Sequence, residues 1–214
     1  MVRRLVIVFA LIALSFASLS ATASAASTYH WPVPDSTRIT QGFKGNAHKG
    51  IDIGGRRAGV AGDTIVAFYG GRVARAGWST SYGWVVYIHH SINNTNYQSR
   101  YAHMNKAPVV STNNNVGKGT KLGEMGSSGQ AQGVHLHFET RKCSGACLTD
   151  NSSTAVDPIS NFFPGYKNNV PASTAPIEKA DHDNELEVFY SMEEIREMSM
   201  EERLAKGIPF EAIT

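Results

Sequence analysis

The sequence predicts an all-β domain, and two observations support this class. Short segments rich in β-branched and aromatic residues recur through the middle of the chain, separated by many of its 20 glycines. No helical period of useful length occurs before about residue 185. No internal repeat with a fixed period is present. The expected strands are residues 64–69, 72–76, 84–89, 97–101, 122–125 and 134–139.

Turn residues link several of the expected strands. Gly70 and Gly71 predict a tight hairpin between the first two strands. The pair Tyr82-Gly83 and the pair Asn93-Asn94 mark two further turns.

The first 25 residues have the pattern of a secretory signal peptide. Two arginines precede a short apolar run over residues 5–14, and an A-x-A pattern ends at Ala25. The run is shorter than the roughly 18 residues that a membrane span requires, so an uncleaved anchor is the weaker alternative. No later run approaches that length. We therefore expect an exported protein with no transmembrane segment in its mature chain.

Composition changes near residue 170. We expect a domain over residues 26–167, a polar linker over 168–176 and a C-terminal tail over 177–214. Residues 26–176 hold fourteen Lys/Arg and seven Asp/Glu, a net charge of +7. The tail holds four Lys/Arg and eleven Asp/Glu, a net charge of −7. The near-neutral whole chain thus combines a basic domain with an acidic tail.

The tail carries helix signals. Ser191 and Ser199 are each followed three residues later by a glutamate, which is the capping-box pattern. Gly207 and Pro209 are typical of a helix end. One or two short helices are expected. Two alternatives stay open: a solvated tail without effect, or an intramolecular contact with the basic domain that lowers activity.

The only two cysteines, Cys143 and Cys147, predict a disulfide in an exported chain. The bond would close a very short loop, so it would gain little unfolded-state entropy and would act as a local clip. Two thiolate metal ligands are the weaker alternative, because nothing nearby completes a cysteine-rich zinc site.

Two histidine-containing motifs point to a metal. His135 and His137 share one face of an expected strand, so one imidazole can bind a metal while the other reaches the adjacent water or substrate. Glu139 lies on that face and could orient a ring. A pair of surface histidines is the alternative. Upstream, His48 and Asp52 add an imidazole and a carboxylate, donors that suit a catalytic Zn²⁺ with three protein ligands.

These motifs in this order resemble the lysostaphin/LytM-type zinc endopeptidases. The resemblance rests on H-K-G-I-D at residues 48–52, Y-A-H at 101–103 and G-V-H-L-H-F-E at 133–139, and it spans roughly residues 31–164. It implies a compact antiparallel β domain, a sandwich-barrel hybrid with the LytM-type duplicated motif. It also implies a site made of the zinc ligands His48, Asp52 and His137 and the catalytic residues His135 and His103. His135 would be the general base, and no substrate-binding residue is assigned.

The function implied is an exported zinc endopeptidase that hydrolyses peptide bonds in the stem peptides or cross-bridges of bacterial peptidoglycan. It would act as a monomer, secreted or in the periplasm or cell wall. A basic domain suits an anionic wall, and no nucleic-acid partner is expected. The alternative is a non-catalytic wall-binding or activator module of the same fold, against which the five site residues argue. The other histidines are expected to pack or form hydrogen bonds: His30, His89, His90 and His182.

Overall fold

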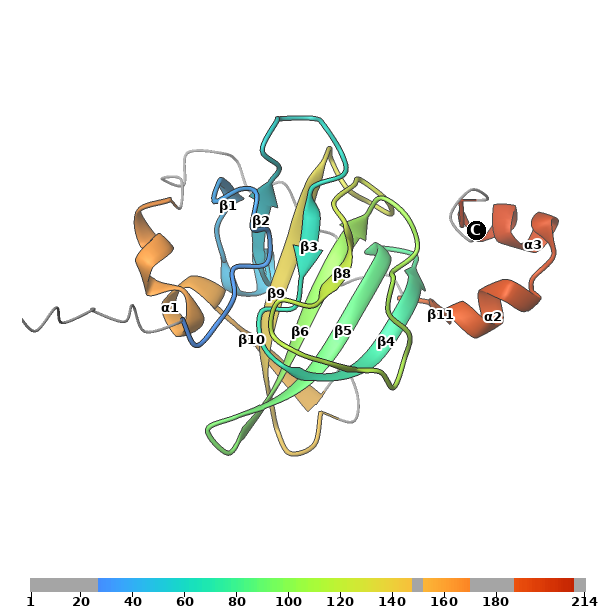
Figure 1. The fold of residues 1–214 in the computed structure, drawn as a ribbon. Helices are drawn as coiled ribbons and strands as arrows, with labels where there is room; N and C mark the ends of the chain where they lie inside the picture. Colours follow the sequence, from blue (N-terminus) through green and yellow to red (C-terminus); the bar gives the residue numbers. More distant parts are fainter. Residues whose placement is uncertain (1–26, 148–151, 170–186, 210–214) are drawn as a thin grey trace, which may run out of the picture.

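The computed structural model describes residues 27–147, 152–169 and 187–209 (Figure 1). The strands are β1 (Ile39–Gln41), β2 (Ile51–Gly54), β3 (Thr64–Val66), β4 (Gly71–Ser79), β5 (Gly83–Ile92), β6 (Thr95–Met104), β7 (Asn115–Val116), β8 (Lys121–Glu124), β9 (His135–Cys143), β10 (Ser153–Val156) and β11 (Phe189–Ser191). The helices are α1 (Pro158–Phe162), α2 (Met192–Glu197) and α3 (Met200–Ala205), with 3₁₀ helices η1 (Gly45–Ala47) and η3 (Pro164–Asn169). The expected signal peptide and most of the expected linker lie outside the described residues.

One large antiparallel sheet dominates the fold (Figure 1). In the described part of the chain nine strands form it, along the path β1-β2-β9-β6-β5-β4-β11, with β10 paired to β9 and β7 paired to β4. β3 and β8 form a separate two-stranded sheet. The path has two open ends, so these strands do not close into a barrel. The predicted all-β class is confirmed, with short helices in the tail.

The main hydrophobic core joins the two sheets. Ile65 of β3 and Leu122 of β8 belong to the same buried cluster as Trp84 and Val86 of β5 and Phe138 of β9. Side chains alternate along a strand, so β5 presents every second residue to this core. Burial of such large apolar side chains contributes roughly 1.5–3 kcal/mol each relative to exposure.

The opposite face of β5 is apolar as well. Val85 and Tyr87 form a second buried cluster with Tyr82 and Ala102. A strand that is buried on both faces reads as a nearly continuous apolar run, which is how Trp84 to Ile88 appears in the sequence. The second cluster lies beside the polar residues described below.

The turn between β5 and β6 has the predicted chemistry. Asn93 and Asn94 have φ angles of 49° and 59°, and Ile92 pairs directly with Thr95. Two left-handed residues in a two-residue loop define a type I′ hairpin turn, which asparagine tolerates better than most residues do. The turn between β4 and β5 ends at Gly83, with a φ of 64°.

The predicted hairpin at Gly70 and Gly71 is wrong. β3 pairs with β8, whereas β4 pairs with β5 and β7. Neither glycine has a positive φ. Gly71 instead allows close packing, because a Cβ there would lie 2.2 Å from the carbonyl oxygen of His89. Gly71 therefore serves a strand contact, and the sequence does not distinguish this use from a turn.

Five strands lie outside the predicted segments. β1, β7 and β11 have only two or three residues, which is too short for an alternating pattern to show. β2 and β10 have four residues each. β2 buries Ile51 and Ile53 and leaves Asp52 on its other face, so it is the missed strand that matters most for function.

One short helix, α1, also lies where none was expected. The Asp157 carboxylate accepts a hydrogen bond from the Ile159 backbone N–H, and Pro158 occupies the first turn. With five residues the helix is too short to show a helical period.

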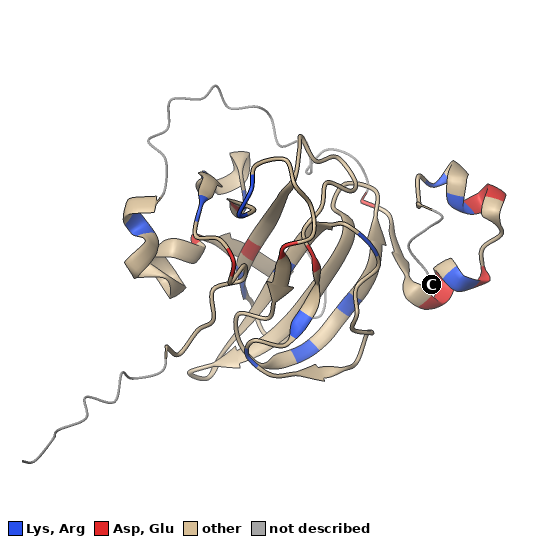
Figure 2. Cartoon of the chain, turned by 45° about the horizontal axis from the view of Figure 1, so that its top comes forward, with Lys and Arg blue, Asp and Glu red and all other residues tan. Residues whose placement is uncertain are grey.

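The two capping boxes expected in the tail are both present. The Ser191 hydroxyl accepts from the Glu194 N–H and the Ser199 hydroxyl from the Glu202 N–H, and both glutamates bond back to the cap. α3 ends at Ala205, and Gly207 follows shortly after it with a φ of 68°, so this glycine stands at a helix end as predicted. Figure 2 shows acidic and basic residues side by side on both tail helices.

The described part of the tail packs against the domain. β11 pairs antiparallel with β4 and extends the open edge of the large sheet. Met192, Ile195 and Ile208 are buried in the main hydrophobic cluster. Arg75 of β4 lies over the ring of Phe189, 5.0 Å from its centroid. Apolar packing and strand pairing therefore contribute to the contact, beyond the opposite charges that suggested it.

The helices of the described residues are all too short or too polar to cross a membrane.

Candidate metal centre and catalytic site

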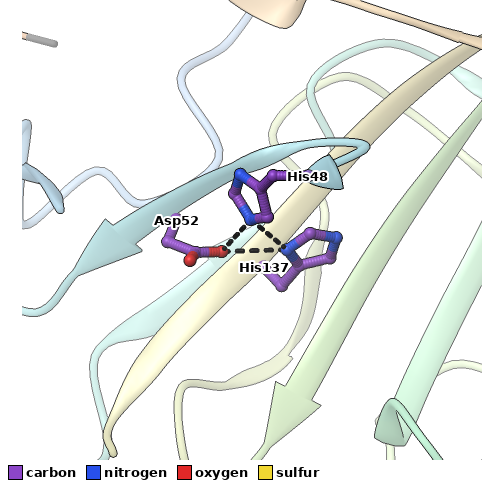
Figure 3. A group of neighbouring side chains, drawn as sticks. All are labelled: His48, Asp52 and His137. Carbon is purple, nitrogen blue, oxygen red and sulfur yellow. Dashed lines mark hydrogen bonds and ion pairs between the residues drawn. The ribbon is translucent and has the colours of Figure 1, made fainter. Parts of the chain in front are cut away.

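The three predicted metal ligands meet where β2 pairs with β9 (Figure 3). Asp52 on β2 stands directly opposite His137 on β9 in the antiparallel register. His48 lies between η1 and β2, in an extended conformation that ends the 3₁₀ turn. A loop and two strands thus bring together residues that are far apart in the sequence.

The three ligand atoms converge on one another. Asp52 Oδ1 lies 2.8 Å from His137 Nδ1 and 3.1 Å from His48 Nε2, and the two nitrogens are 3.2 Å apart. All three lie within 4.8 Å of one another, as a metal site requires. Ligands of a tetrahedral zinc ion with bonds near 2.1 Å are about 3.4 Å apart, so a slight separation makes room for the ion.

The other ring nitrogens show which atoms carry protons. His48 Nδ1 lies 2.8 Å from the carbonyl oxygen of Gly42, which can only accept, so Nδ1 is the donor. His137 Nε2 lies 3.2 Å from Glu139 Oε1, which is also an acceptor. In the neutral rings, His48 Nε2 and His137 Nδ1 are left as lone pairs facing the Asp52 carboxylate. Three lone pairs that face one another fit a bound cation.

The charges of the cluster point the same way. Burial lowers the pKa of His137, but the hydrogen bonds and charges of Asp52 and Glu139 outweigh burial and raise this pKa to about 9. Burial raises the pKa of Asp52, and bonds to His137 and His48 overcome this effect and hold it far below its usual range. The site therefore favours a positive charge at its centre, either a proton or a metal cation.

Glu139 anchors the ring of His137 from behind. It is fully buried, and its Oε1 accepts a 2.5 Å hydrogen bond from the Tyr82 hydroxyl as well as the bond from His137. Its Oε2 accepts from Arg141 Nη1 at 2.8 Å and lies 3.9 Å from Arg100 Nε. Burial raises the pKa of Glu139, but the Arg100 charge and the His137 bond keep it well below its ordinary value. An ionised Glu139 fixes the ring so that Nδ1 faces the cluster.

His135 lies beside the cluster on the same face of β9. Its Nε2 is 3.7 Å from Asp52 Oδ1, and its Nδ1 lies 2.9 Å from the carbonyl oxygen of Gly133. The carbonyl must accept, so Nδ1 carries the proton and the neutral ring keeps a lone pair on Nε2. This imidazole can accept a proton next to the three converging donor atoms.

His103, at the end of β6, has an unusual backbone. Its φ is 61°, a left-handed conformation that costs a non-glycine residue roughly 1–3 kcal/mol and often occurs at active sites. Three hydrogen bonds hold it there. Its N–H donates to Tyr82 O at 2.8 Å, its carbonyl accepts from Gly126 at 2.9 Å, and Nδ1 donates to Ser128 O at 2.8 Å. Its ring centroid lies 4.9 Å from that of His135.

The structure brings together all five residues predicted for the site. His90 is elsewhere, buried against the carbonyl of Gly70 and the hydroxyl of Ser99, and His89 contacts Gln98, so both fit the expected packing role. His30 lies next to the Trp31 carbonyl. His182 lies outside the described residues.

Sequence reasoning missed several supporting residues. Arg141 follows Glu139 by two positions on β9, and that spacing could have revealed it. Tyr82 and Ser128 have no local signal, because they reach the site from separate loops. The Gly42 carbonyl likewise could not be predicted from a motif, because a backbone group is not specified by side-chain identity.

Cys143 and Cys147 form the predicted disulfide. Cys143 is the last residue of β9, so the bond clips the loop that leaves the site strand.

Comparisons with known proteins identify relatives for most of this domain. The family model described as peptidase family M23 matches residues 46–158, which include all five candidate residues. The peptidoglycan DD-endopeptidase ShyC of Vibrio cholerae is 34% identical over 93 residues, 44% of this chain and 20% of that protein. The chain therefore spans about a fifth of that relative's length.

Two solved structures match parts of this chain. A peptidase M23 from Pseudomonas aeruginosa matches with a TM-score of 0.50 and 26% identity, over 65% of this chain and 51% of the other. The catalytic domain of lysostaphin from Staphylococcus simulans matches with a TM-score of 0.44 and 23% identity, over 66% of this chain and 92% of the other.

Proposed function

Because this chain belongs to peptidase family M23, we propose that it is an exported zinc-dependent endopeptidase that hydrolyses peptide bonds in bacterial peptidoglycan. The family match confirms the resemblance seen in the motifs at residues 48–52 and 133–139. One observation carries the proposal: the lone pairs of His48, Asp52 and His137 converge beside two further imidazoles.

Zinc suits this donor set. Two imidazole nitrogens and one carboxylate oxygen are the borderline and hard ligands that Zn²⁺ accepts, and three protein ligands leave a fourth position open. A zinc ion bound here would polarise the scissile carbonyl and lower the pKa of the attacking water toward neutrality. Glu139 would hold His137 in the ligating orientation through the bond to Nε2.

His135 is the proposed general base. Its Nε2 lies 3.7 Å from Asp52 Oδ1, and the Gly133 carbonyl keeps the ring proton on Nδ1. The neutral ring can therefore take a proton from the attacking water at Nε2. General-base catalysis of this kind contributes roughly 10²–10⁴-fold in rate.

His103 is the proposed partner across the site. The Ser128 carbonyl fixes a proton on its Nδ1, so Nε2 is the nitrogen that changes its protonation. As an imidazolium it can donate to the oxyanion of the tetrahedral intermediate or give its proton to the leaving amine. The proton gained by His135 and the proton given by His103 would then balance one round of hydrolysis once the two rings re-equilibrate through water.

Peptidoglycan is the proposed substrate for two reasons. The relative with 34% identity is named a peptidoglycan DD-endopeptidase, although the match covers only a fifth of it. Residues 26–176 also carry a net charge of +7, which favours an anionic wall polymer over a cationic partner. Stem peptides and cross-bridges both contain bonds of the required kind.

Export and domain organisation are part of the proposal. The N-terminal pattern of residues 1–25 supports cleavage of a signal peptide, and the Cys143–Cys147 disulfide suits an oxidising compartment. We place the peptidase domain at residues 26–167, followed by a linker over 168–176 and the tail over 177–214. The mature protein would act as a monomer in the periplasm, in the cell wall or after secretion.

A non-catalytic wall-binding module of the same fold is the second candidate. It would need no general base and no strained histidine. The left-handed backbone of His103, held by three hydrogen bonds, favours the catalytic reading, since a binding module gains nothing from that cost.

Digestion of purified peptidoglycan tests the proposal. Zinc-loaded protein covering residues 26–214 should release fragments with new amino termini, which labelling and mass spectrometry would identify. A His135→Ala variant should still bind the wall and release far fewer. The proposal fails if the parent protein binds zinc and wall but creates no new amino termini, because it would then be a binding module.

A further inference from the structure

We propose that the C-terminal tail is a positioning element of the active site, acting through Glu187 and the turn between β4 and β5, residues 79–83. The inference deepens the proposed function and rests on it. Without such a role in the active site, the tail would only add an edge strand and two short helices to the fold. The contacts below form a continuous path from the tail to a metal ligand and to a catalytic histidine.

The tail holds the outer side of this turn. Glu187 Oε1 accepts hydrogen bonds from Ser79 Oγ at 2.9 Å and from Tyr87 Oη at 2.8 Å. The next residue, Val188, accepts a backbone bond from Thr80 at 3.1 Å and donates its N–H to Thr80 Oγ1 at 3.3 Å. β11 then continues along β4. The first described tail residues are thus bonded to the turn itself.

Ser79 connects Glu187 to the backbone of the turn. Its side chain is fully buried, and its hydroxyl proton points to Glu187. The oxygen lone pairs are then directed to the backbone N–H groups of Ser81 at 3.3 Å and Tyr82 at 3.1 Å. A hydroxyl has one proton and two lone pairs. When the proton is donated to Glu187, both lone pairs are left to accept from the backbone N–H groups of the turn. Loss of that acceptor would let the hydroxyl rotate and donate to Ser81 Oγ, 3.3 Å away, within the turn itself.

Tyr82 connects the turn to both halves of the site. Its hydroxyl donates to Glu139, which orients the metal ligand His137. Its ring stacks on His137, with centroids 5.8 Å apart and 26° between the planes. Its carbonyl accepts the N–H of His103, one of three bonds that hold the left-handed backbone there. A shift of Tyr82 would therefore move a ligand and a catalytic residue together.

A second contact joins the turn to His103. The Ser81 carbonyl accepts the N–H of Gln130 at 2.9 Å, and Ser128 Oγ accepts the N–H of Trp84 at 3.0 Å. The carbonyl of Ser128 in turn holds His103 Nδ1. Gly83 and Gly129 pack so closely that a Cβ on Gly129 would lie 2.3 Å from Gly83 N. The turn and the loop at residues 126–130 must therefore move as one unit.

A positioning role and an inhibitory role of the tail predict opposite effects on the turnover number. In the large sheet β11 is separated from β9 by β4, β5 and β6, so the described tail supports the site from its far side. Removing the tail contact should lower the turnover number, whereas removing an inhibitory segment would raise it. A displacement of catalytic groups by a fraction of an ångström to 1 Å is enough for such a loss.

The test compares Glu187→Ala with Glu187→Gln, which keeps the acceptor oxygen, and with Glu197→Ala, which removes an exposed tail carboxylate. Tyr82→Phe removes only the inner hydroxyl. Turnover and KM on soluble wall peptides, zinc affinity, and the visible spectrum of the cobalt-substituted proteins would be measured. We expect Glu187→Ala and Tyr82→Phe to lower turnover by about 10-fold or more with little change in KM. Both should alter the cobalt spectrum, whereas Glu187→Gln and Glu197→Ala should resemble the parent.

Parental turnover and cobalt spectrum in Glu187→Ala would overturn the inference, and so would faster hydrolysis, which would make the tail inhibitory. It would also be overturned if Gln and Ala at residue 187 lowered thermal stability equally with unchanged spectra, because the contact would then be structural only. The cobalt spectrum reports metal geometry without any substrate. If the parent binds metal but leaves the wall intact, the proposed function is wrong. The cobalt spectra of the variants would still test whether the tail positions the metal ligands.

Discussion

The two ends of the large sheet differ in what they bury: polar side chains of the candidate metal centre at one end and apolar side chains at the other. At the metal end, β2 and β9 bring polar atoms face to face in a buried cluster, with the lone pairs of His48, Asp52 and His137 pointing at one another. At the tail end, β4 and β11 continue the sheet, and the attached helix buries Met192 and Ile195 in the main core. The three lone pairs at the first end can take a cation, whereas the apolar contacts at the second end need no ligand.

The difference shows where function and stability are separated. Three lone pairs that converge in a buried cluster are stabilised by a positive charge, so the metal end is where a cation is expected. Apolar burial at the tail end stabilises the fold without such a requirement. The turn at residues 79–83 joins the ends, because it bonds to Glu187 on one side and through Tyr82 to Glu139 on the other.

The largest effect should come from removing a ligand at the metal end. His48→Ala should abolish stoichiometric zinc binding and reduce wall hydrolysis by about 10³-fold or more, since the metal supplies several kcal/mol of transition-state stabilisation. Metal analysis and fragment release would measure both effects. The matched control His30→Ala should keep about one zinc and near-parental activity. Full hydrolysis by His48→Ala would sink the ligand assignment.

The next effect should come from His135, which lies beside the cluster. His135→Ala should retain zinc but lose roughly 10²–10⁴ in turnover, because a general base is removed while the ligands stay. Turnover on soluble peptides at saturating zinc would show this. A variant that hydrolyses the wall at the parental rate would leave His103 as the base.

A smaller effect is expected at Glu139, which orients the ring of His137. Glu139→Gln keeps the shape but removes the charge that attracts the Nε2 proton, so zinc affinity should fall roughly 10–100-fold. Competition with a chelator would measure the affinity. Glu124→Gln, a surface carboxylate paired with lysines, is the control and should bind zinc like the parent. Equal affinity in both variants would show that Glu139 does not orient the ligand.

The smallest effect should follow loss of the disulfide. Replacing both Cys143 and Cys147 by Ser should leave the turnover number unchanged, because the loop lies beyond the end of the site strand. The free energy of unfolding should fall by about 2 kcal/mol at most, given the shortness of the loop. Denaturant titration would detect it. A large loss of turnover would show that the clip positions β9.

The sequence was informative where chemistry is local. The spacing of His135, His137 and Glu139 places them on one face of a strand, and the bond from His137 to Glu139 follows from that spacing. The capping boxes in the tail are local in the same way. The meeting of Asp52 with His137 came only through family resemblance, because the pairing register of two distant strands has no local signature.

Long-range contacts explain what could not be predicted. Tyr82 meets Glu139 across 57 residues, and Ser79 meets Glu187 across 108 residues. Neither contact has a periodic or motif signal. The same limit applies to Gly70 and Gly71, where the local turn pattern was overridden by the pairing of β3 with β8.

The distinction between the three converging donors and the neighbouring histidine can be tested by counting metal. Zinc would be measured in the purified parent, in His137→Ala and in His135→Ala after dialysis against trace zinc. The lone-pair geometry predicts about one zinc per chain in the parent and in His135→Ala, and essentially none in His137→Ala. Retention of zinc by His137→Ala together with its loss from His135→Ala would contradict the account.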